Sequence, residues 1–90
     1  MRTCVKTANF DGFELRYFRT TTQGEDEEVD LCYGVYVEKY VDGNLVEEMG
    51  SGPVSEDVSQ ISDVIDLLFE GSVTPFALNE ILDEMEVLHQ

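Results

Sequence analysis

The chain has 90 residues and a formal net charge of −15, and 42% of its residues are hydrophobic. This length supports a single domain, residues 1–90, with one modest core, and the hydrophobic content argues against a disordered chain. The negative charge repels phosphate backbones and anionic lipids, so we expect neither direct nucleic-acid binding nor membrane binding.

The charge is distributed unevenly along the sequence. All five bases precede residue 40: Arg2, Lys6, Arg16, Arg19 and Lys39. From residue 40 to the end of the chain there are twelve acids and no base. An acidic surface keeps a small protein in solution, and it also suits a basic partner.

The first residues, MRTCVKTANF, lack the apolar run of a signal peptide, and no stretch approaches the ~18 apolar residues of a membrane span. We therefore expect a cytoplasmic protein. Cys4 and Cys32 are too few and too far apart for a disulfide framework or a zinc site, and we interpret them as reduced thiols.

The first half of the chain predicts strands, within residues 2–49. Residues 2–8 form a plausible short strand, and residues 9–12 read as a turn. Residues 13–22 alternate apolar and polar side chains, as half-buried strands do. The acidic segment 23–29 is best interpreted as a hairpin loop.

Residues 30–41, rich in tyrosine and valine, give the strongest strand signal. One face of this strand carries Leu31, Tyr33, Val35, Val37 and Val41. Gly34 within it indicates a bulge or a close backbone approach.

Residues 42–44 turn the chain into another strand, 45–49. A three-residue loop would set Val41 against Leu45, Val37 against Met49 and Lys39 against Glu47. A two-residue loop would set two glutamates opposite each other, which is repulsive, so we favour the longer loop.

The second half predicts two helices, at about 55–70 and 75–88, from apolar side chains at helical spacing. They are Val58, Ile61, Val64, Ile65 and Leu68 in the first helix, and Leu78, Ile81, Leu82, Met85 and Leu88 in the second. Residues 50–53 read as the strand-to-helix turn, Ser55 as the N-cap of the first helix, and Gly71 as its stop. Thr74 is expected to cap the second helix, with Pro75 at its first position. The short linker favours an antiparallel hairpin. The predicted fold class is α+β: an antiparallel meander of three to four strands, followed by a C-terminal antiparallel helical hairpin packed on one face.

Residues for catalysis are sparse, and we expect no catalytic residue, no cofactor and no specific metal site. The single histidine, His89, is next to the last residue. The sequence contains no glycine-rich phosphate loop with the required lysine. The acids of segment 24–30 are contiguous and lack the alternating spacing of an EF-hand loop, which leaves only weak divalent-metal binding open.

The sheet face turned away from the helices offers a candidate partner-binding surface. If Val35 and Val37 face the helices, the opposite face carries aromatic side chains. The candidate residues are Phe18, Tyr36, Tyr40 and Val46. Exposed aromatic patches are typical of protein interfaces, although tyrosines are also ordinary on a solvated sheet face. The leading hypothesis is a non-enzymatic cytosolic protein-interaction module that self-associates or binds a protein through this face.

The outer surfaces of the helices offer the alternative, an acidic regulator that masks a basic or nucleic-acid-binding surface of another protein. The candidate residues are Asp63, Asp66, Glu70, Glu80, Asp83 and Glu84. The helices have no lysine to pair with these acids. The fold therefore tolerates these acids without using them for stability.

The order YGVYVEKY, DGN, a Ser-capped helix and GSVTPFALNEIL resembles a family of short uncharacterised bacterial proteins of unknown function. In that family a Tyr-Gly strand precedes a helix and a Val-Thr-Pro turn into a final helix. The likeness covers residues 31–82 and implies no particular activity, cofactor or site residue.

Overall fold

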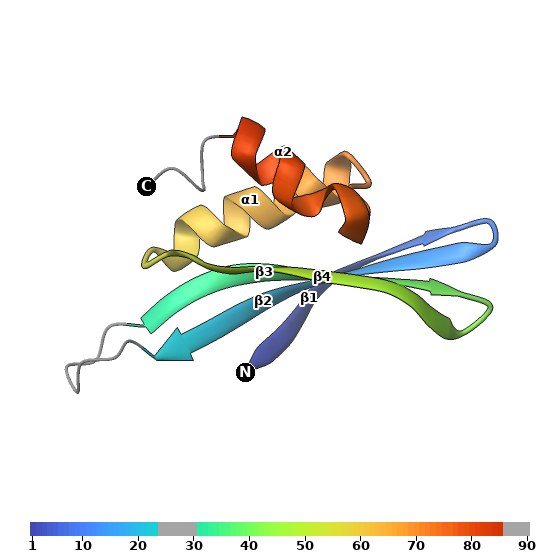
Figure 1. Cartoon of the computed structure of the whole chain (residues 1–90), viewed down its shortest axis with the longest axis horizontal. Coiled ribbons are helices and arrows are strands. Elements are labelled where there is room, and N and C mark those ends of the chain that lie inside the picture. The colour runs from blue at the N-terminus through green and yellow to red at the C-terminus, as the bar shows by residue number, and fades with distance from the viewer. Residues whose placement is uncertain (24–30, 86–90) are drawn as a thin grey trace.

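The computed structural model describes residues 1–23 and 31–85, and in them a four-stranded antiparallel sheet is followed by helices (Figure 1). The strands are β1 (Arg2–Phe10), β2 (Phe13–Gln23), β3 (Leu31–Val41) and β4 (Asn44–Ser55), paired in the order β1-β2-β3-β4. They are followed by α1 (Val58–Glu70), the 3₁₀ helix η1 (Pro75–Ala77) and α2 (Leu78–Glu84). The predicted α+β class and the antiparallel meander are confirmed.

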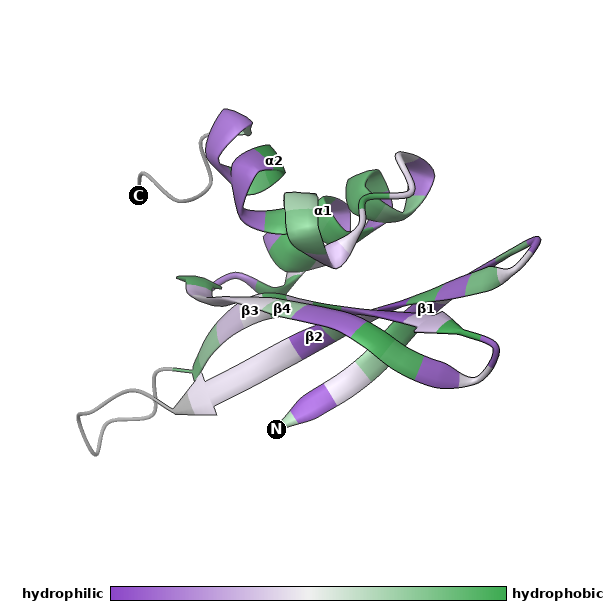
Figure 2. Cartoon of the chain, turned by 45° about the vertical axis from the view of Figure 1, so that its right-hand side comes forward, coloured by the Kyte–Doolittle hydropathy of each residue, from purple (hydrophilic) through white to green (hydrophobic). Residues whose placement is uncertain are grey.

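The helices lie over one face of the sheet, and Figure 2 shows apolar segments of α1 next to the sheet. α1 contacts all four strands, whereas α2 and η1 contact β4. The structure therefore has two separate helices, and not a clear antiparallel hairpin. The predicted second helix is divided, because Pro75–Ala77 is 3₁₀ and the α-helix begins at Leu78. Residues 86–88 of the prediction lie outside the described residues.

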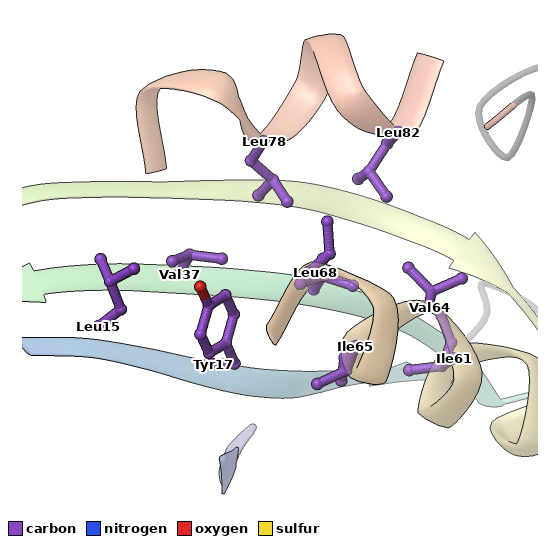
Figure 3. Close-up of a cluster of buried hydrophobic side chains, with 10 residues drawn as sticks. Leu15, Tyr17, Val37, Ile61, Val64, Ile65, Leu68, Leu78 and Leu82 are labelled. Carbon is purple, nitrogen blue, oxygen red and sulfur yellow. The ribbon is translucent and has the colours of Figure 1, made fainter. Parts of the chain in front are cut away.

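The core lies between the sheet and the helices (Figure 3). Its members are Leu15 and Tyr17 of β2, Val35 and Val37 of β3, Ile61, Val64, Ile65 and Leu68 of α1, and Leu78 and Leu82 of α2. Burial of each such side chain is worth roughly 1.5–3 kcal/mol, which makes this layer the main source of stability. The alternation in β2 and β3 and the helical spacing in α1 predicted these buried residues, but Leu31 and Val58, predicted on the same faces, are 39% and 38% exposed.

The β3–β4 hairpin corrects the predicted loop. Its loop has two residues, Asp42 and Gly43, whose φ angles of 52° and 82° give the positive-φ pair of a type I′ turn. Val41 therefore pairs with Asn44. An extra residue in β4, Val46, then forms a bulge.

Because of the Val46 bulge, the inner pairs have the register that the three-residue loop was expected to produce. Lys39 pairs with Glu47, and Val37 pairs with Met49. Two of the three predicted pairs are therefore confirmed, whereas the predicted loop and the predicted pair of Val41 with Leu45 were wrong, since Leu45 pairs with Tyr40.

The segment 50–53 is part of β4 and is not the turn that its glycines suggested. Gly52 has a φ of 74°, and the β3–β4 register shifts on both sides of Gly34. A Cβ added to Gly34 would lie only 2.1 Å from the carbonyl oxygen of Gly52. The predicted close approach at Gly34 therefore exists, and the backbone of β4 makes it.

The helix boundaries also differ from the prediction. Asp57, and not Ser55, is the N-cap of α1, since its side chain accepts a hydrogen bond from the Ser59 amide at 2.9 Å. At the other end Gly71 has a φ of −87°, and the left-handed residue is Ser72, with a φ of 52°. Thr74 precedes η1 without a capping hydrogen bond from its side chain, and Pro75 occupies the first helical position as expected.

Candidate interaction surfaces

The sheet face opposite the helices, called here the open face, brings two of the predicted residues into contact. Phe18 of β2 and Tyr36 of β3 are cross-strand partners, and their rings meet edge to face with centroids 6.1 Å apart. Gly50 of β4 leaves room for the Tyr36 ring, because a Cβ there would lie 2.9 Å from it. The Tyr36 hydroxyl donates a hydrogen bond to Glu48. Both rings are half-buried.

Arg2 of β1 covers this aromatic pair. Its guanidinium carbon lies 4.2 Å from the centroid of Tyr36 and 5.6 Å from that of Phe18, within the range of cation–π attraction. An Arg2 nitrogen is also 3.8 Å from a carboxylate oxygen of Glu38. Glu38 is only 7% exposed, so this ion pair offsets part of the cost of burying its charge.

Tyr40 belongs to a second cluster on the open face. The guanidinium carbon of Arg16 lies 4.1 Å from the Tyr40 ring centroid, and Arg16 is ion-paired with Glu14. The Tyr40 hydroxyl donates to Glu38 at 2.9 Å, and this hydrogen bond raises the pKa of Tyr40. The open face is therefore an aromatic surface covered by arginines, and not a bare aromatic patch.

Val46, the fourth predicted residue, lies elsewhere. The bulge places it at a hollow of about 270 Å³ between β4 and η1. The hollow is lined by Val46, Glu47, Glu48, Met49, Pro75 and Phe76. We call this feature the β4–η1 hollow.

All five bases of the chain lie over aromatic rings of the same fold. Besides Arg2 and Arg16, Lys6 lies 5.2 Å from Phe69, Lys39 lies 5.1 Å from Phe13, and Arg19 lies 5.8 Å from Tyr33. The sequence showed five bases before residue 40 but gave no sign of these pairings.

The six candidate acids of the helices are spread over α1 and α2. Asp63, Glu70, Glu80 and Glu84 are exposed. Asp66 is half-buried and lies 3.4 Å from the Lys6 nitrogen. Asp83 also has a partner within the fold. The alternative surface therefore keeps most of its charge toward solvent.

The potential metal ligands of residues 1–23 and 31–85 are not clustered. No group of three or more His, Cys, Asp or Glu in these ranges could hold a metal ion. Both cysteines are free. The acidic segment 24–30 and His89 lie outside the described residues. In the described part, no helix has the length and apolar character needed to cross a membrane.

The fold and these surfaces define an α+β protein with a four-stranded antiparallel meander, helices on one face and an arginine-covered aromatic cluster on the other. The chain belongs to the Family of unknown function (DUF6514), which matches residues 2–86. This match confirms the resemblance to a family of unknown function. No curated protein and no solved structure matches the chain.

Proposed function

We propose that the protein is a non-enzymatic, cytosolic protein-interaction module that self-associates through its open face. The single observation that carries the proposal is the half-buried Phe18–Tyr36 pair under the Arg2 guanidinium. Aromatic residues and arginine are enriched in interfaces and among the residues that dominate binding energy.

Charge opposes association of two copies of the chain, and it opposes it least at the open face. Two molecules of charge −15 repel each other, and the repulsion is weakest where each presents bases. The open face carries Arg2 and Arg16 among the acids Glu14, Glu38 and Glu48. A two-fold dimer would place the same surface on both sides, so that an arginine of one copy can approach a ring or carboxylate of the other.

Sedimentation equilibrium tests this proposal with the double variant Tyr36→Ser/Tyr40→Ser. We expect the wild type to dimerise, and to do so more strongly at about 0.5 M than at about 0.05 M NaCl, because salt screens the repulsion. The double variant should stay monomeric. The control is Leu67→Ser, which changes a 55% exposed apolar residue on α1 and should leave dimerisation intact. A monomeric wild type, or a double variant that dimerises as well as the wild type, would contradict the proposal.

A second candidate function, the acidic regulator, is favoured by the exposed acids of the helices. Because α1 and α2 contain no lysine or arginine, these acids dominate the charge that the helices present. The variant with lysine at Asp63, Glu70, Glu80 and Glu84 tests it. A basic protein captured by the wild type at about 0.1 M salt should be released at about 0.5 M and should not bind this variant. Equal capture by the two proteins would contradict this function.

A further inference from the structure

The β4–η1 hollow is bordered by apolar side chains that the fold leaves in water. Phe76 is 87% exposed, Val46 is 52% exposed and Met49 is 37% exposed. Pro75 and Leu78, on either side of Phe76 in the chain, are buried. Phe76 therefore contributes little to the core, although the segment that carries it is firmly anchored.

Glu47 adds an unpaired charge to the same hollow. One of its carboxylate oxygens is shielded from solvent and has no hydrogen-bond partner among the described residues. Its cross-strand neighbour Lys39 lies over the Phe13 ring, and no ion pair between Lys39 and Glu47 occurs in the described part of the chain. The shielded oxygen cannot be reached from solvent, but the other carboxylate oxygen is not shielded, and a cation in the hollow would stabilise the shared negative charge through it.

The size and chemistry of the hollow indicate what could fill it. Its volume of about 270 Å³ is slightly below that of typical small-molecule sites, and it suits one or two side chains. The apolar lining of Val46, Met49 and Pro75 favours an aliphatic side chain. Glu47 and the exposed ring of Phe76 together favour arginine, whose guanidinium pairs with carboxylates and stacks on rings.

We propose that the β4–η1 hollow binds an extended segment of another protein that carries an aliphatic residue and, two positions later on the same face, an arginine. The aliphatic side chain enters the hollow, and the arginine lies between the Glu47 carboxylate and the Phe76 ring. This arrangement repeats the pairing of cation and ring that the protein makes with each of its own bases. Of the residues named for the two surfaces, the hollow shares only Glu48 with the open face, and binding there does not depend on self-association.

Fluorescence polarisation with two labelled peptide pools tests the inference. One pool has a central leucine followed two positions later by arginine, with small residues elsewhere, and the matched pool has glutamate in place of arginine. We expect the arginine pool to bind saturably, and the Phe76→Ser and Glu47→Gln variants to bind it at least about tenfold more weakly. Phe76→Ser should stay folded, since that side chain is mostly in water.

The matched controls are Leu67→Ser and Glu70→Gln, which make the same kinds of change on the exposed surface of α1. They should bind the arginine pool as the wild type does. The inference is overturned if the glutamate pool binds equally well, if Phe76→Ser and Glu47→Gln keep full affinity, or if the controls lose as much affinity as they do. Phe76→Ser should not change sedimentation of the protein alone, so failure here is distinguishable from failure of the open face.

Discussion

Among the described core residues, Tyr17 is the one whose polar group joins the sheet to the helical layer. Its ring is fully buried, and its hydroxyl donates to the carbonyl oxygen of Val73 at 2.9 Å, which ties β2 to the segment between α1 and η1. Burial raises the pKa of Tyr17 to about 12. The hydroxyl is therefore a proton donor to Val73 throughout the range in which most proteins are studied.

Replacement of Tyr17 by phenylalanine should lower the free energy of unfolding by about 1–3 kcal/mol, because the Val73 carbonyl loses its partner. The pH dependence should change as well. An unfolded tyrosine loses its proton near pH 10, whereas folded Tyr17 keeps it to about pH 12. The wild type should lose stability as pH rises between these values, by at most about 1.4 kcal/mol per unit.

Denaturant unfolding of both proteins at a series of pH values from neutral to about 11.5 measures this effect. The difference between wild type and Tyr17→Phe isolates Tyr17, since the other titrating groups are common to both. A difference that does not shrink above pH 10 would contradict the assignment.

At the end of α1 the left-handed residue is Ser72, and not Gly71, which was predicted as the stop. Ser72, with its φ of 52°, is the left-handed residue, and its amide donates to Phe69 while the Val73 amide donates to Leu68. This is the Schellman pattern, in which glycine is the usual left-handed residue. Gly71 has a negative φ, so its missing side chain is not required there.

We therefore expect opposite preferences at these neighbouring positions. Ser72→Gly should stabilise the protein by up to about 1 kcal/mol through relief of left-handed strain. Gly71→Ala should also stabilise it, by about 0.4–1 kcal/mol, because its Cβ would meet only ordinary contacts. Thermal and denaturant unfolding measure both. A strongly destabilised Gly71→Ala variant would contradict this expectation and would show that α1 requires glycine at position 71 to end.

At the scale of elements, the pairing of β3 with the end of β4 depends on the absence of a side chain at Gly34. Besides the Gly52 carbonyl, a Cβ at Gly34 would lie 2.8 Å from the Thr20 hydroxyl oxygen. Gly34→Ala should cost about 1–3 kcal/mol or more, because backbone must move apart to admit the methyl group. Thr22→Ala, at an exposed site on β2, is the control and should change stability little. A Gly34→Ala protein as stable as the wild type in urea would show that β4 can shift freely.

The periodicity of apolar residues predicted which faces of the strands and of α1 are buried. It did not predict local changes of backbone geometry that a single residue causes. β2, β3 and α1 bury the faces that their apolar spacing indicated, because burial dominates their energetics. The Val46 bulge is a local event: the pairs Lys39–Glu47 and Val37–Met49 were predicted correctly, but the pair Val41–Leu45 and the position of Val46 were not. The end of β4 was not predicted, because residues 50–53 contain glycines and a proline, which usually signal a turn.

The contacts on the two candidate surfaces could be predicted only in part from the sequence. The approach of Phe18 to Tyr36 follows from strand alternation and register. The position of Arg2 over them requires the β1–β2 register, which includes a bulge between Cys4 and Lys6. Phe76 did leave a signal, because it falls outside the apolar stripe of Leu78 and Leu82, but a single aromatic residue in a turn does not identify a hollow.

For the molecule as a whole, charge repulsion opposes compactness. The chain has twenty acids and five bases, and the described residues form only three ion pairs. We expect the melting temperature to rise by several degrees between about 0.01 and 0.3 M NaCl, as salt screens this repulsion. A variant with amides at Asp63, Glu70 and Glu84 should be more stable at low salt and respond less to added salt. Equal salt responses in calorimetry would assign the stabilisation to another cause.

The seating of every base on an aromatic ring has a consequence in acid. A contact between a cation and a ring needs no ionised carboxylate, so it persists as pH falls and carboxylates take up protons. As pH falls, the repulsion between molecules is lost before the contacts between cations and rings are, because the net charge approaches zero near the isoelectric point of about 4.1. The protein should therefore precipitate near its isoelectric point while still folded. It should dissolve again in native form when the pH is returned to neutral.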